Sequence, residues 1–169
     1  MGDNWPETDP GDTLPPGRSA RPLDDIDRRI LDVLTRDARI SVRTLAERVH
    51  VSRSNAHARL DRLIGDGVIT GFRAEIDPRK AGLDTSAHIA LSIEQNSWRT
   101  VAAALRQVPY VVHIALLSGD HDALLLVRAP DNATLRHVVL DRVQRIEGVR
   151  HTRTWLCFEE YDANGAHWT

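Results

Sequence analysis

The sequence is poor in cysteine and has no long hydrophobic run. Its single cysteine, Cys157, cannot form an internal disulfide or a cluster of thiolate metal ligands, and its apolar flanks predict a small buried side chain. No apolar stretch approaches the roughly 18 residues that a membrane-spanning helix needs. The N-terminal residues lack the basic start and apolar stretch of a secretory signal. We therefore expect a cytoplasmic protein without a membrane-spanning segment.

The chain also lacks an excess of positive charge, because its formal net charge is −2 at pH 7. This balance argues against a protein coated in basic surface. The charge is unevenly distributed, however, since the segment from Arg39 to Phe72 has six arginines and three acidic residues. A local basic segment in a mildly acidic protein is compatible with a nucleic acid bound by one face.

The first half of the chain predicts a disordered arm followed by three helices. Residues 1–22 are rich in Pro, Gly, Asp and Thr and show no apolar periodicity. Apolar residues then recur at helical spacing in three segments, and two of these segments follow a good N-cap, Ser41 or Ser52. The third segment ends at Gly65 and Gly67. The sequence VITGFRAEID comes next and is short and alternating enough for a small hairpin, or wing.

The second half of the chain has the alternating apolar and polar pattern of β-strands. After the connector PRKAGLDTS, residues 87–94 alternate between apolar and polar, and helical and strand patterns then follow in the order βαββαβ, which is ferredoxin-like. A sheet with helices on one face leaves its other face to be covered, most simply by a second copy of the chain. The expected fold is α+β, with an arm at 1–22, a winged helix-turn-helix at 23–76, a linker at 77–86, a βαββαβ domain at 87–162 and a tail at 163–169.

The second and third predicted helices have the pattern of a helix-turn-helix, whose second helix enters the major groove of DNA. Ala46 is small where the helices approach closely, and Ser52 caps the second helix. His50 stands at the turn position usually held by glycine, and histidine tolerates positive φ better than most residues. Residues placed to reach base edges are Arg53, Ser54, Asn55 and His57. Residues placed for phosphate contacts are Arg43, Arg59 and Arg62, with Arg62 pointing away from the core.

Two other interpretations of these helices stay open. An arginine-rich helix can be no more than a solvated face, and similar helix pairs occur in domains that bind proteins. The capped turn, the exposed polar start of the helix and the local positive charge together favour binding to double-stranded DNA.

The stretch LSGDHDALLLVR, residues 117–128, places three acid/base and metal-ligating residue types beside a run of leucines. In an extended segment Asp120 and Asp122 point to one side and His121 to the other, so the three cannot easily converge on one metal ion. We therefore predict no metal site there. The stretch is typical of a hairpin that leads into a buried strand.

Taken together, the sequence resembles the Lrp/AsnC family, the feast/famine regulators. The resemblance covers about residues 23–160 and is carried by the opening LDDIDRRIL, by RLIGDGVITGF after the third helix, and by SGDHDALLLV. It implies a transcriptional regulator with a winged helix-turn-helix, a βαββαβ domain that binds an amino acid or related metabolite, and no other cofactor. It also implies dimers formed through the sheets, often assembled into rings of four dimers.

In the family the effector lies near the loop that is Ser118 to Asp122 in this chain. The resemblance implies that Gly119 allows the backbone to approach the ligand, and that Asp122 is a partner for an α-amino group. The remaining residues implied at this site are Ser118, Asp120, His121, Thr152 and Thr154.

Two further classes of function are compatible with the resemblance. Some proteins of similar sequence are enzymes, the siroheme decarboxylases, which hold a tetrapyrrole with His and Arg, and the second half of this chain contains several histidines. A ligand-binding or assembly module that does not bind DNA is the other. The arginine-rich, well-capped third helix favours a non-enzymatic regulator over both.

Overall fold

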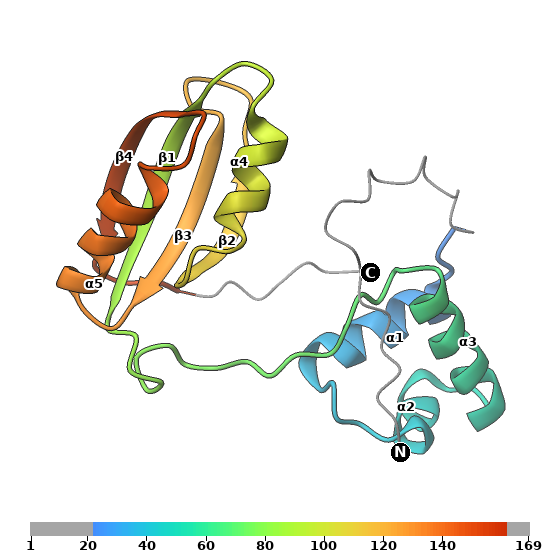
Figure 1. The fold of residues 1–169 in the computed structure, drawn as a ribbon. Coiled ribbons are helices and arrows are strands. Elements are labelled where there is room, and N and C mark those ends of the chain that lie inside the picture. Colours follow the sequence, from blue (N-terminus) through green and yellow to red (C-terminus); the bar gives the residue numbers. More distant parts are fainter. Residues whose placement is uncertain (1–21, 162–169) are drawn as a thin grey trace. The chain divides into compact units, whose positions relative to one another are not determined.

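The computed structural model describes residues 22–161, which form two compact units, residues 22–75 and residues 76–161 (Figure 1). The expected tail at 163–169 and, except for Pro22, the expected arm at 1–22 lie outside the described residues. No helix in residues 22–161 is long and apolar enough to cross a membrane.

The first unit contains three helices around a small apolar core. They are α1 (Asp25–Arg36), α2 (Val42–Val49) and α3 (Arg53–Gly65). Each helix begins at a side-chain cap, because Asp24, Ser41 and Ser52 accept hydrogen bonds from backbone N–H groups of the first turn. The largest fully buried core side chains are Ile30, Leu45, Val49 and Leu63. The three predicted helices are confirmed.

The turn between α2 and α3 depends on His50, which adopts the left-handed conformation with φ 58°. Its backbone N–H donates to the carbonyls of Ala46 and Glu47, which ends α2. The positive φ expected at this position is confirmed, although glycine would adopt it at lower cost.

The predicted hairpin after α3 is not formed. The backbone N–H of Ile69 donates to Leu63 at 2.9 Å, and the chain then continues to Asp84 without a paired strand. A strand needs both a backbone partner and a surface to pack on. Phe72 and Ile76 belong to no strand within the described residues, and their side chains are 45% and 66% exposed.

The second unit is a four-stranded antiparallel sheet with helices, and it confirms the βαββαβ order. The strands lie in the order β2-β3-β1-β4. Strand β1 begins two residues earlier than expected, inside the predicted linker. The elements are β1 (Thr85–Ile93), α4 (Trp98–Leu105), β2 (Val111–Leu116), β3 (Ala123–Ala129), α5 (Asn132–His137), the π-helical segment η1 (Val138–Val143) and β4 (Val149–Cys157).

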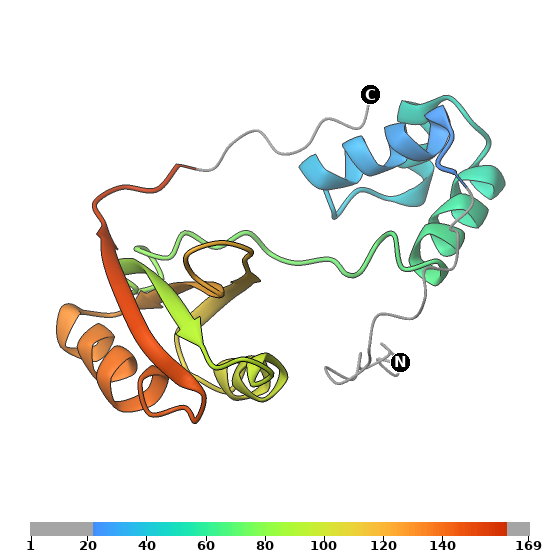
Figure 2. The same ribbon diagram turned by 90° about the horizontal axis from the view of Figure 1, so that it is seen from above.

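The helices of this unit cover one face of the sheet (Figure 2). On β1 the fully buried Ala87, Ile89 and Leu91 face them and pack with Val101 of α4 and Val143 of η1. Because side chains alternate along a strand, the intervening residues point to the opposite side, which we call the open face. On β1 the open face consists of Ser86, His88, Ala90 and Ser92.

Candidate nucleic-acid interface and sensor loop

The N-terminal turn of α3 presents a row of polar side chains. Ser52 caps the helix by accepting from the backbone N–H of Asn55 at 3.3 Å, and the buried Ala56 anchors the turn against the core. The helix therefore begins at a fixed point with its inner side packed. The four side chains predicted to reach base edges are all exposed: Arg53, Ser54, Asn55 and His57.

These side chains differ in their contacts. Arg53 makes no hydrogen bond or ion pair with any residue in the described range. His57 Nδ1 lies 2.7 Å from Asp61 Oδ2, and the Asn55 Oδ1 atom accepts from Arg59 Nε at 2.8 Å. Because this bond uses one of the two lone pairs of Asn55 Oδ1, the amide keeps one acceptor site and both NH₂ donors for a ligand.

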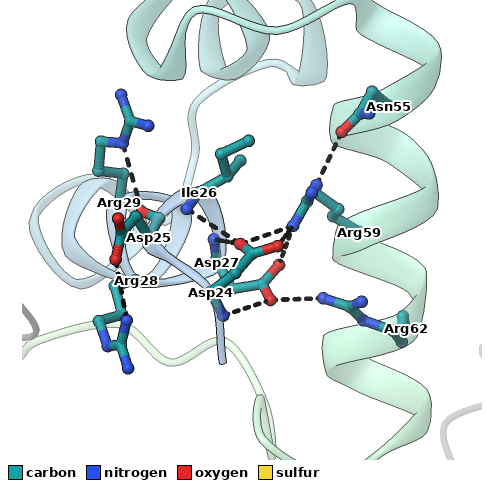
Figure 3. A network of polar contacts seen from close by, with 9 residues as sticks. All are labelled: Asp24, Asp25, Ile26, Asp27, Arg28, Arg29, Asn55, Arg59 and Arg62. Carbon is teal, nitrogen blue, oxygen red and sulfur yellow. Dashed lines mark hydrogen bonds and ion pairs between the residues drawn. The ribbon is translucent and has the colours of Figure 1, made fainter. Parts of the chain in front are cut away.

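Arg59 and Arg62 lie differently from the prediction. Both point toward the start of α1, where Arg59 Nη1 is 2.7 Å from Asp24 and from Asp27, and Arg62 Nη2 is 2.6 Å from Asp27 (Figure 3). The Asp27 side chain is only 1% exposed. The expectation that Arg62 points away from the core was wrong, because a buried carboxylate on the neighbouring helix binds its guanidinium group.

This network, which we call the α1–α3 ion cluster (Asp24, Asp27, Arg59 and Arg62), shifts the titration of its members. The hydrogen bond from Arg59 lowers the pKa of Asp24 from 3.8 to about 2, and the two carboxylates raise the pKa of Arg59. The sequence analysis did not predict this cluster. The available signal was the pair of acids three residues apart on α1 together with two arginines three residues apart on α3.

Arg43 on α2 is the predicted phosphate contact that keeps an exposed side chain. Its only described partner is Glu47, at 3.3 Å, and both side chains are largely in solvent. Such an exposed pair contributes little and is easily exchanged for another partner.

The loop between β2 and β3 is fixed to the end of β1 by Asp122. The Asp122 backbone N–H donates to the Leu91 carbonyl at 2.8 Å, and its Oδ2 atom accepts from the Ile93 backbone N–H at 2.7 Å. The Asp122 carbonyl in turn accepts from Leu117 N–H at 2.9 Å, which closes the loop. Asp122 therefore has a structural role in addition to the one implied by the resemblance.

The other loop residues are arranged around this anchor. Gly119 has φ 147°, a conformation that side-chain-bearing residues rarely adopt, while its Cβ position is open space. Ser118 and Asp120 are exposed. His121 turns to the open face, where its ring meets Trp155 of β4 edge to face with centroids 6.3 Å apart.

Thr152 and Thr154 lie on β4 and pair with Leu91 and Ile89, which places both on the helix-covered side of the sheet. Thr152 accepts from Gln144 Nε2 at 2.7 Å and lies at the same end of the sheet as the Asp122 anchor, on the other side of β1. Thr154 lies two residues farther along β4, away from the loop. No described contact joins either threonine to residues 118–122.

Comparison with known proteins agrees with both units. Residues 23–70 match the family described as winged helix-turn-helix DNA-binding, and residues 86–166 match the Lrp/AsnC ligand binding domain. A protein with these two parts is a DNA-binding transcriptional regulator with a ligand-binding domain.

Individual relatives support the same class. The HTH-type transcriptional regulator AldR of Mycolicibacterium smegmatis is 42% identical over 143 residues, which cover 83% of this chain and 84% of the relative. A regulator of Neisseria meningitidis, solved as a complex with L-Met, is 30% identical with a TM-score of 0.78, covering 84% of this chain and 94% of that one. The leucine response regulatory protein LrpA of Mycobacterium tuberculosis is 29% identical with a TM-score of 0.76, covering 87% and 100%. The chain belongs to the Lrp/AsnC family of transcriptional regulators.

Proposed function

We propose that this regulator reads its operator with the N-terminal turn of α3. The observation that carries the proposal is the exposed set Arg53, Ser54, Asn55 and His57 at the end of a capped helix. Arginine and asparagine bind guanine and adenine in bidentate fashion in the major groove. Ser52 is the cap that fixes where this turn starts.

The arginines divide into two roles. Arg43 is exposed with a single weak partner and is a phosphate contact. Arg59 and Arg62 are neutralised by the two acids of α1, so we assign them to holding α3 in place. Through its bond to Asn55, Arg59 also orients a base-reading side chain.

The effector is an amino acid or a related small metabolite bound at the loop Ser118–Asp122. The L-Met complex of the Neisseria meningitidis relative supports an amino acid. Asp122 Oδ2 accepts the hydrogen bond from the Ile93 backbone N–H, which leaves Asp122 Oδ1 to accept from an α-amino group. Glycine at 119 keeps the backbone of this loop accessible to the ligand, Asp120 and His121 select which ligand fits, and Thr152 and Thr154 are weaker candidates.

The working assembly is a homodimer formed through the open face and extended to an octamer or higher. Support comes from the apolar side chains of that face, because Trp155 is 42% exposed and Leu124 and Leu126 are only partly buried. A second copy would cover them, as an uncovered apolar sheet face requires. We place the assembly in the cytoplasm.

Several measurements test this function. Fluorescence anisotropy with the promoter of the protein's own or a neighbouring gene should show saturable, sequence-dependent binding, and sequence-blind binding that never saturates would refute the regulator. A visible absorption band that copurifies with the chain would instead favour the tetrapyrrole enzyme. A thermal-shift screen of the amino acids, combined with light scattering, tests the effector and the assembly.

A further inference from the structure

Three different metal-ligating groups meet on the open face, where β1 begins and β4 ends. His88 lies on β1, Cys157 is the last residue of β4, and Glu160 follows three residues later. Each offers one ligand atom, and the three atoms lie within 4.8 Å of one another. Asp120, His121 and Asp122, whose residue types also suggest metal binding, form no such group in the described range.

The sheet fixes two of the three ligands. Cys157 pairs with Ser86, and Trp155 pairs with His88, so His88 and Cys157 are diagonal neighbours on adjacent strands of one face. Ligands on paired strands keep their spacing better than ligands on loops. Glu160 lies beyond the end of β4, where its side chain can adjust its position to the other two ligands, His88 and Cys157.

The His88 side chain has an unused polar atom at this place. Its Nδ1 atom is buried and has no hydrogen-bond partner in the described part of the chain. Buried polar atoms in folded proteins almost always have a partner, and a metal ion bound through this nitrogen would be one. Burial, followed by the nearby Glu160 charge, raises the pKa of the Cys157 thiol. Metal binding would displace the thiol proton, because the thiolate is the ligand.

Arg128 places a positive charge beside this group, because its guanidinium forms an ion pair with Glu160. Its Nε atom lies 3.4 Å from Glu160 Oε2, so it contacts one carboxylate oxygen and leaves the other available. This contact is an ion pair rather than a hydrogen bond, because Arg128 Nε has no hydrogen-bond partner among the described residues. A thiolate and a carboxylate together also offset the charge of a divalent ion beside a guanidinium group.

We propose that His88, Cys157 and Glu160 bind one Zn²⁺ ion per chain. Nitrogen, sulfur and oxygen ligands together are typical of zinc, and three protein ligands leave a fourth tetrahedral position for water or for a group of a second copy. Ligand atoms around tetrahedral zinc are about 3.5 Å apart. Two ligand atoms at the upper limit of 4.8 Å would therefore have to approach by about 1 Å, which rotation of the Cys157 and Glu160 side chains can provide. None of the three ligands belongs to the sensor loop, although His121 of that loop contacts Trp155, which pairs with His88.

Cobalt substitution of the full-length, chelator-treated protein tests the site. Co²⁺ bound to a thiolate gives a charge-transfer band in the near ultraviolet, and the chain has one cysteine, so the band reports Cys157 alone. We expect the band to saturate at one Co²⁺ per chain and to disappear when one equivalent of Zn²⁺ is added. Absence of the band in the wild-type protein would overturn the proposal.

Variants distinguish zinc bound at this site from zinc bound by histidines elsewhere in the chain. Cys157→Ser should abolish the band, and His88→Gln and Glu160→Gln should each weaken zinc binding, measured against a chromophoric chelator, by at least about tenfold. His113→Gln is the matched control, because His113 pairs with Leu126 on the same face but lies outside the cluster. Circular dichroism checks the fold, and Glu160→Gln, beyond the last strand, tests the site without altering the sheet. Equal zinc affinity in wild type, His88→Gln and Glu160→Gln would refute the site.

Discussion

The Arg59 guanidinium lies 2.7 Å from the carboxylate of Asp27, a side chain that is only 1% exposed. This contact joins α3 to α1, and Arg62 adds a second bond to the same carboxylate at 2.6 Å. A buried acid with two arginine partners is costly to break, because either side would be left with an unpaired charge. The contact also determines which arginines of the helix-turn-helix remain available to DNA.

Asp27→Asn should destabilise the first unit by about 3 kcal/mol, because it leaves two arginines without their buried partner. Hydrogen exchange followed by mass spectrometry, read over peptides of α1 and α3, measures this loss without interference from the second unit. The matched control is Asp25→Asn, whose carboxylate is 91% exposed and, among residues 22–161, pairs only with Arg28. We expect that variant to change stability by less than about 0.5 kcal/mol. Equal protection loss in both variants would contradict the structural role of Asp27.

Acid should weaken the first unit within a defined pH range. The Arg59 hydrogen bond lowers the pKa of Asp24 from 3.8 to about 2, so the Asp24 carboxylate stabilises the fold above about pH 3.8. That contribution is lost as the pH falls from 3.8 toward 2. Exchange or circular dichroism across this range should show a smaller decline in Asp24→Asn than in wild type, and an identical decline would count against the assignment.

Arg43 and Arg59 should differ in how their loss changes DNA binding. Arg43→Ala should lower the slope of log affinity against log salt by about one unit and leave stability unchanged, as loss of one phosphate contact does. Arg59→Ala should weaken binding and stability while leaving the slope unchanged, because its charge is already neutralised by Asp24 and Asp27. A slope lowered by one in Arg59→Ala, with stability unaltered, would restore Arg59 as a phosphate contact.

Asp122→Asn tests the effector site while keeping the fold. Asparagine can still accept from Ile93 N–H with its amide oxygen, but it removes the charge that an α-amino group would bind. We expect the amino acid found in the thermal-shift screen to bind at least about tenfold more weakly, with little change in stability. Asp120→Asn is the control on the same loop. Unchanged amino acid affinity in Asp122→Asn would exclude the proposed contact.

Patterns local in the sequence predicted most of the fold. The caps at Ser41 and Ser52, the positive φ of His50 and the alternation along β1 each depend on neighbouring residues, and each is confirmed. The winged helix-turn-helix class is confirmed, but VITGFRAEID forms no paired strand within the described residues, because alternation alone does not supply the partner strand that a hairpin needs.

The candidate sites were less predictable, because they depend on contacts between distant segments. Helical geometry placed Arg59 and Arg62 on α3 correctly but could not show that Asp27, 32 residues from Arg59, lies opposite them. Similarly, Cys157 was expected to be an inert core residue. Only the pairing of β1 with β4 brings it near His88.

The central claim is that the first turn of α3 reads DNA sequence. Asn55→Ala, measured by fluorescence anisotropy on the preferred operator and on random DNA of equal length, tests it most directly. We predict a loss of about 1–3 kcal/mol on the operator, a much smaller loss on random DNA, and relaxed preference at one base position. Equal losses on both DNAs would contradict the claim.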